Sequence, residues 1–120
     1  MKYLILPKPK VMIIFVSYKC NSRCIMCHIW QKQGKATYLS VNEIDNFLSD
    51  QLLGNYLERI NLTGGEPTLY NELVKLVGVF INRCPSLKNI DMPTNGINSG
   101  LVLEEIEKIL ALLFPTNITL

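Results

Sequence analysis

The sequence lacks long hydrophobic runs, because its longest unbroken apolar segments, Val11–Val16 and Ile109–Phe114, contain six residues each. A helix that crosses a bilayer needs about 18 apolar residues or more, so we expect no membrane span. The chain is also poor in charge: 18% of its residues are Asp, Glu, Lys or Arg, whereas 48% are apolar. Intrinsically disordered chains have the opposite balance, so the composition predicts a folded domain.

Acidic side chains are absent from the first 42 residues, which contain seven Lys or Arg. These basic residues are scattered singly and do not alternate with aromatic residues, so we do not expect nucleic-acid binding. Pro7 and Pro9 interrupt the N-terminal apolar patch, and no small-residue cleavage site follows. A signal peptide is therefore not expected, and the expected compartment is the cytoplasm.

Strand-like and helix-like segments alternate along the 120 residues. This alternation is typical of parallel βαβ units. A complete eight-stranded β/α-barrel needs about 250 residues, so the chain is too short for one. We predict an α/β fold for residues 1–120: a partial, TIM-like β/α-barrel with about three βα units and the start of a fourth parallel strand. The expected strands span residues 11–16, 58–63, 87–92 and, incompletely, 116–120, and the later two of the three expected helices span residues 70–83 and 101–114.

The first of the three expected helices, which precedes these two, begins at a recognisable capping motif. Ser40 and Glu43 fit a capping box, in which each side chain accepts a hydrogen bond from the other residue's backbone amide. Apolar residues then recur at helical spacing from Val41 to Leu52. Gly54 is expected to stop the helix in the left-handed conformation.

A loop of more than 20 residues follows the first strand and holds Cys20, Cys24 and Cys27 in a C-x₃-C-x₂-C spacing. Thiolates are soft ligands that bind iron–sulfur clusters and zinc. Three thiolates leave one iron of a 4Fe–4S cluster open, whereas a structural zinc site usually has four ligands. The spacing favours an open cluster, and a zinc site that includes the adjacent His28 is the alternative.

The Cys20–Cys27 segment resembles the cluster motif of the radical S-adenosylmethionine (radical SAM) enzymes. Two further motifs of this family follow the next two expected strands, namely Thr63–Pro67 (TGGEP) and Pro93–Gly96 (PTNG). Because sites in parallel α/β folds form where the carboxyl ends of the strands meet, the three motifs are expected to lie together. Asn21, Met26 and Trp30 also resemble the subset of the family that carries C-terminal auxiliary (SPASM-type) clusters.

The resemblance implies a 4Fe–4S cluster and S-adenosylmethionine (SAM) as cofactors. Reductive cleavage of SAM would give a 5′-deoxyadenosyl radical, which abstracts hydrogen from a small-molecule or peptide substrate that the sequence does not identify. A reductant such as flavodoxin or ferredoxin is implied as a partner. The family's barrel usually has six or more βα units, so we also expect a missing C-terminal half or self-association. A non-catalytic iron–sulfur or zinc module, or an inactive remnant, is the alternative function.

Several residues have two interpretations at this point. The metal ligands implied by the resemblance are Cys20, Cys24 and Cys27, and the implied SAM-binding residues are Gly64, Gly65, Glu66, Pro67, Met26, Thr94 and Asn95. The two glycines would allow the backbone to approach a ligand closely. Glu66 is either catalytic or a carboxylate that stabilises its turn, and Met26 either contacts adenine through its backbone or forms an apolar wall under the loop.

Three more residues have expected positions. His28 is expected to face solvent or to lie beside the ligands, and Trp30 is expected to anchor the loop by packing. Cys84 lies at the end of a predicted helix, which places it at the opposite rim of the sheet from the three motifs. We expect Cys84 to pack in the core and not to bind the cluster.

Overall fold

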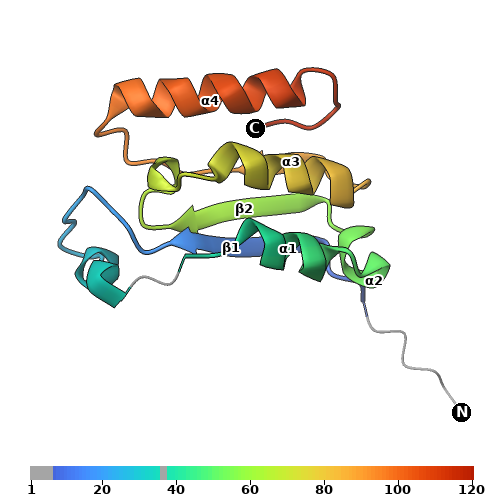
Figure 1. Ribbon diagram of the computed structural model, residues 1–120, viewed down its shortest axis with the longest axis horizontal. Helices are drawn as coiled ribbons and strands as arrows, with labels where there is room; N and C mark the ends of the chain where they lie inside the picture. Colours follow the sequence, from blue (N-terminus) through green and yellow to red (C-terminus); the bar gives the residue numbers. More distant parts are fainter. Residues whose placement is uncertain (1–6, 36–37) are drawn as a thin grey trace, which may run out of the picture.

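The computed structural model describes residues 7–35 and 38–120 and contains a three-stranded parallel sheet in the order β1-β2-β3, with helices between the strands (Figure 1). This arrangement confirms the predicted α/β fold and is that of a partial β/α-barrel. Thr119 forms a single parallel bridge to Asn89, at the outer edge of the third strand. The elements in chain order are β1 (Val11–Ser17), η1 (Ile29–Lys35), α1 (Val41–Leu48), α2 (Gln51–Gly54), β2 (Arg59–Gly64), η2 (Pro67–Leu69), α3 (Leu73–Arg83), β3 (Asn89–Asp91) and α4 (Ser99–Leu113).

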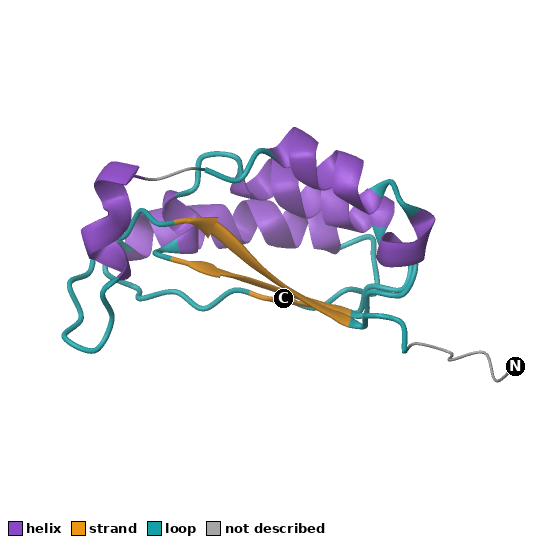
Figure 2. Cartoon of the chain, turned by 90° about the horizontal axis from the view of Figure 1, so that it is seen from below, coloured by secondary structure: helices purple, strands orange, loops and turns teal. Residues whose placement is uncertain are grey.

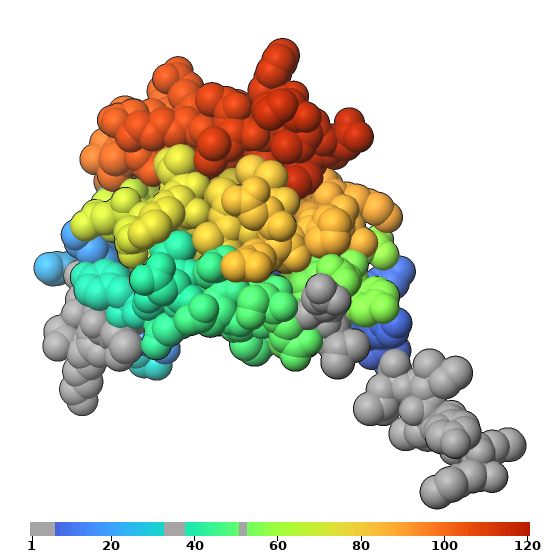
Figure 3. All heavy atoms as spheres, turned by 45° about the vertical axis from the view of Figure 1, so that its right-hand side comes forward, coloured from blue at the N-terminus to red at the C-terminus, as the bar shows by residue number. Residues whose placement is uncertain are grey.

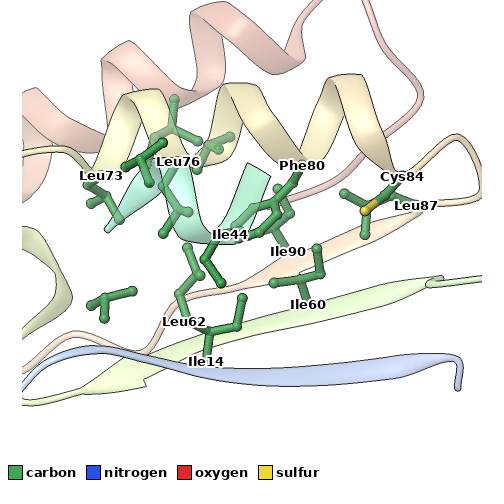
Figure 4. Packing of buried hydrophobic residues seen from close by; sticks show 14 of the residues in the cluster. Ile14, Ile44, Ile60, Leu62, Leu73, Leu76, Phe80, Cys84, Leu87 and Ile90 are labelled. Carbon is green, nitrogen blue, oxygen red and sulfur yellow. The ribbon is translucent and has the colours of Figure 1, made fainter. Parts of the chain in front are cut away.

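The core lies between one face of the sheet and the helices (Figure 4). Side chains alternate between the two faces of a strand, so Ile14, Ile60 and Leu62 point to the same side. They meet Leu76 and Phe80, which α3 presents at helical spacing and which are fully buried. In the space-filling view, α1, α3 and α4 follow one another across this face (Figure 3).

The opposite face of the sheet is bare. The helices that pack on the sheet, α1, α3 and α4, lie on one side of the strands (Figure 2). Val11, Ile13 and Phe15 alternate with the core residues of β1 and are more than half exposed, with 64% of Ile13 accessible. Parallel sheets are normally covered on both faces, so an exposed apolar surface of this kind normally packs against other protein elements.

The first helix begins as predicted but ends earlier. The capping box of Ser40 and Glu43 is present, and α1 ends at Leu48 because Ser49 donates backbone and side-chain hydrogen bonds to the carbonyl of Asn46. The prediction of a left-handed Gly54 is wrong, since among the described residues only Gly64 and Gly96 have positive φ. A Cβ at Gly54 would lie 2.6 Å from the Arg83 carbonyl oxygen, so glycine there permits close packing against the end of α3.

Other boundaries also shift. The turn η2 precedes α3, which begins at Leu73 and not at residue 70. The loop after β1 that holds Cys20, Cys24 and Cys27, here named the cysteine loop, contains the 3-10 helix η1, whereas the sequence predicted only a loop. None of the helices within residues 7–35 and 38–120 is long and apolar enough to cross a membrane.

Candidate functional site

The loops after β1, β2 and β3 meet at the carboxyl end of the sheet, where the sequence predicted them to lie. The first two run side by side, because the backbone amides of Gly65 and Glu66 donate to the carbonyls of Ser17 and Lys19 at 2.9 and 2.8 Å. These bonds continue the pairing of β1 with β2 into the loops, beyond the last register pair at Ser17 and Gly64. The cysteine loop is therefore attached to the turn that carries the second motif.

The two glycines of this turn accommodate the chain's own backbone. A Cβ at Gly64 would lie 2.3 Å from the Ser17 carbonyl oxygen, and a Cβ at Gly65 would lie 2.1 Å from that of Lys19. Gly64 also has a φ of 126°, which side-chain-bearing residues rarely adopt. Glycine is thus required here for the contact between the turn and the cysteine loop.

Glu66 is a buried carboxylate, with only 2% of the residue exposed. It accepts hydrogen bonds from the backbone amide and hydroxyl of Thr68 at 3.3 and 2.7 Å, from the Thr94 hydroxyl at 2.9 Å and from the Asn95 amide at 2.7 Å. Burial raises the pKa of Glu66, but these hydrogen bonds, that of Asn95 foremost, outweigh it and hold the pKa below its ordinary value. The charged carboxylate stabilises the turn and holds the third loop against it.

Thr94 and Asn95 bring the third motif into the same cluster of loops. The Thr94 side chain reaches Glu66, whereas the Asn95 side chain reaches the cysteine loop. The Asn95 Nδ2 donates to Asn21 Oδ1 at 2.8 Å and lies 3.9 Å from Cys20 Sγ. Side chains of all three motifs are therefore connected by hydrogen bonds.

The cysteines occupy one loop with different degrees of exposure. Cys20 is half-buried, and Cys24 and Cys27 are exposed. The backbone amide of Ser22 donates to Cys20 Sγ at 3.4 Å, and the Ser22 hydroxyl lies 3.0 Å from Cys24 Sγ. Within the described residues, no three His, Cys, Asp or Glu side chains are gathered closely enough to hold a metal ion.

Three thiolates on one loop have the right chemistry for an iron–sulfur cluster. Two of these thiols are exposed, so a cluster has access to them without unpacking the core. The three sulfurs are not gathered within the described residues, so binding of a cluster would require the loop to bring them together. The alternative zinc site with His28 is likewise not assembled, and His28 is exposed, as expected.

The other residues singled out from the sequence are less closely connected to the site. Met26 is 88% exposed, so of its two interpretations the apolar wall beneath the loop is wrong, whereas the backbone contact with adenine stays a prediction. Trp30 is half-buried, and the Arg23 guanidinium lies over its ring at 5.6 Å from the centroid. This position agrees with the expected anchoring of the loop.

Cys84 is buried among core side chains at the C-terminal end of α3 (Figure 4). This is the opposite end of the helix from the turn after β2 that carries Glu66. Burial raises the pKa of its thiol to about 11. The expectation that Cys84 packs in the core is confirmed. Sequence reasoning missed Thr68, whose two hydrogen bonds to Glu66 depend on the η2 turn and leave no pattern in the sequence.

Comparisons with known proteins agree with this arrangement of motifs. The family model described as Radical SAM superfamily matches residues 14–119. A GTP 3′,8-cyclase of Shewanella denitrificans is 32% identical over 83 residues, which are 64% of this chain and 23% of that protein. Molybdenum cofactor biosynthesis protein 1 of Homo sapiens is 34% identical over 100 residues, which are 79% of this chain and 15% of that protein. A probable GTP 3′,8-cyclase of Saccharolobus islandicus is 32% identical over 85 residues, or 70% of this chain and 26% of that protein.

The chain thus matches between 15% and 26% of the length of these relatives. The family match does not distinguish the subset with auxiliary clusters, so that part of the sequence interpretation stays a prediction. The matched region does run through the cysteine loop, the turn after β2 and the loop after β3, which the hydrogen bonds of Glu66 and Asn95 join. The chain belongs to the radical SAM superfamily.

Proposed function

We propose that this chain is the N-terminal part of a radical SAM enzyme core. In this proposal Cys20, Cys24 and Cys27 hold a 4Fe–4S cluster. The turn Gly64–Pro67 binds SAM, together with Met26, Thr94 and Asn95. A bound cluster of this kind supplies one electron for the reductive cleavage of SAM.

One observation carries the proposal: the carboxylate of Glu66 holds the loops after β2 and β3 together beside the cysteine loop. Glu66 is buried and already accepts four hydrogen bonds, so its role is to fix the shape of the turn and not to transfer protons. Asn95 has its side chain exposed at the loop surface, where a ligand can reach it. A rigid turn beside a loop that closes on a cluster is suited to holding SAM against an open iron.

The proposal includes partners that the matched region does not identify. A one-electron donor such as flavodoxin or ferredoxin is required, and a reducing compartment such as the cytoplasm suits both the thiolates and the cluster. The bare face of β1 is expected to meet either further βα units or a second copy. Because the relatives match over about a quarter of their length or less, the substrate in their names is not part of this proposal.

Anaerobic reconstitution with iron and sulfide tests the ligand assignment. We expect about four irons and four sulfides per chain, as the composition of a 4Fe–4S cluster requires, and a change in the electron paramagnetic resonance spectrum when SAM is added. Cys24→Ala should lose the cluster, whereas Cys84→Ser, at the far end of α3, should keep it. A full cluster in Cys24→Ala would contradict the assignment, and one zinc per chain in place of iron would support the binding-module alternative.

A further inference from the structure

Asn95 connects the third loop to both of the others. Its backbone amide donates to Glu66, and its side-chain amide donates to Asn21, 74 residues earlier in the chain. The same Nδ2 lies 3.9 Å from the sulfur of Cys20, within the range of an N–H···S contact. Asn95 is thus placed to contact the cysteine loop directly, beside its expected role toward SAM.

The orientation of this amide is fixed by a third contact. The backbone amide of Ile97 donates to Asn95 Oδ1 at 3.0 Å. A backbone amide can only donate, so the atom facing Ile97 must be the oxygen of the side chain. The NH₂ group is therefore directed toward Asn21 and Cys20, and it presents donors to both.

Two N–H groups are directed at the sulfur of Cys20. Its sulfur receives the backbone amide of Ser22 at 3.4 Å in addition to the side-chain amide of Asn95. It is also half-buried, whereas Cys24 and Cys27 are exposed. N–H groups directed at a ligand sulfur stabilise its negative charge, and hydrogen bonds to cluster sulfurs are one determinant of a cluster's reduction potential.

We propose that Asn95 is a positioning residue for Cys20: its amide holds the first cysteine in place for the cluster and raises the cluster's reduction potential. Asn21 supports this role by accepting one of the two amide hydrogens. The inference rests on the proposed function, because it requires Cys20 to be a cluster ligand. In this proposal the third loop influences the cluster through the hydrogen bond that Asn95 donates to Cys20.

The test compares the reconstituted 120-residue chain with Asn95→Ala and Asn95→Asp. Neither substitution removes the backbone hydrogen bond to Glu66, and circular dichroism before reconstitution establishes that each variant is folded. Two quantities are measured anaerobically: the midpoint potential of the cluster by redox titration, and the rate of iron loss to a chelator. We expect a more negative midpoint potential in both variants. The shift should be larger in Asn95→Asp, because its carboxylate faces the sulfur. Iron loss to the chelator should be roughly tenfold faster in both variants.

Two further variants keep the test decisive. Asn82→Ala, on the exposed surface near the end of α3, is the matched control and should keep the wild-type potential and iron-loss rate. Asn21→Ala removes the acceptor that holds the amide and should shift the potential in the same direction as Asn95→Ala. It supplies the measurement if Asn95→Ala takes up no cluster. Wild-type potentials in the Asn95 and Asn21 variants would overturn this inference alone, whereas a wild-type chain that takes up no iron would overturn the proposed function as well.

Discussion

The carboxylate of Glu66 lies 2.7 Å from the backbone nitrogen of Asn95, 29 residues further along the chain. This bond joins the turn after β2 to the loop after β3 through a side chain that is itself buried. Because a buried carboxylate is costly unless its hydrogen bonds are satisfied, the position of the third loop and the ionisation of Glu66 depend on each other.

Glu66→Gln is expected to lower the free energy of unfolding by about 2 kcal/mol, the order of a lost hydrogen bond to a charged group. Glutamine keeps the shape but replaces one acceptor oxygen with an NH₂ group, which then faces a donor such as the Asn95 amide. Urea unfolding measures the difference. Glu107→Gln, at an exposed position on α4, should change the stability by less than about 0.5 kcal/mol. Equal effects of the two substitutions would contradict the role of Glu66.

Substituting alanine for Gly65 and for Gly78 should have opposite effects on the stability of the fold. Gly65→Ala places a Cβ 2.1 Å from the Lys19 carbonyl oxygen, and we expect about 1–3 kcal/mol of destabilisation as the loops separate. Gly78 lies within α3, and a methyl group added there would meet no other part of the fold within 4 Å, so Gly78→Ala should stabilise the helix by about 0.5–1 kcal/mol. Thermal unfolding of both variants is the measurement. Destabilisation by Gly78→Ala, or tolerance of Gly65→Ala, would show that the packing differs.

Low pH should destabilise the amino end of the sheet, because it protonates Glu58. Its carboxylate pairs with Lys10 at 2.7 Å and Lys88 at 2.9 Å, and these partners lower its pKa from 4.5 to about 2. A lowered folded-state pKa means that the stabilisation is present above pH 4.5 and is lost as the pH falls toward 2. Glu58→Gln should therefore flatten the decline of stability between pH 4.5 and 2. Since both pairs are exposed, about 1 M salt should reduce the difference between the variant and the wild type, and salt-independence would contradict this explanation.

The bare face of β1 should make the isolated chain associate with itself. Sedimentation velocity is expected to show oligomers whose fraction rises with protein concentration, and Ile13→Lys should reduce them by placing a charge in the exposed apolar row. Met26→Lys, in the exposed cysteine loop, is the control and should leave association unchanged. A monodisperse wild-type monomer with one cooperative transition above about 65 °C would mean that the partial barrel is stable alone.

Much of the fold was predictable from local patterns. The β-branched run at the start of β1, the capping box of Ser40 and the alternation of Ile60 and Leu62 each depend on residues close in sequence. The early end of α1 was not predictable, because apolar spacing continues through the break at Ser49. The reason for Gly54 also depends on a distant residue, the Arg83 carbonyl.

The candidate site was predictable as a set of motifs but not as a set of contacts. The positions of the cysteine loop and of the turn after β2 follow from the rule that the carboxyl ends of parallel strands share one edge. The contact between Asn21 and Asn95 depends on the detailed course of two loops, and asparagine in a loop is common for local reasons. Only the folded chain shows that Glu66 accepts hydrogen bonds from Thr94 and Asn95.

The link between Asn21 and Asn95 also has a consequence for the order of events during synthesis. Asn95 is added 74 residues after Asn21, which at about 5–20 residues per second corresponds to roughly 4–15 s. Until Asn95 is made, the nascent Cys20 lacks the side-chain amide that the folded chain places beside its sulfur. Glu66 is made later than the cysteines and lacks the donors of Thr94 and Asn95 only until these residues follow, 28 and 29 positions further along the chain. In the proposed function, the cysteines are therefore made several seconds before the loop that completes their surroundings, and cluster insertion is expected to follow the docking of the third loop.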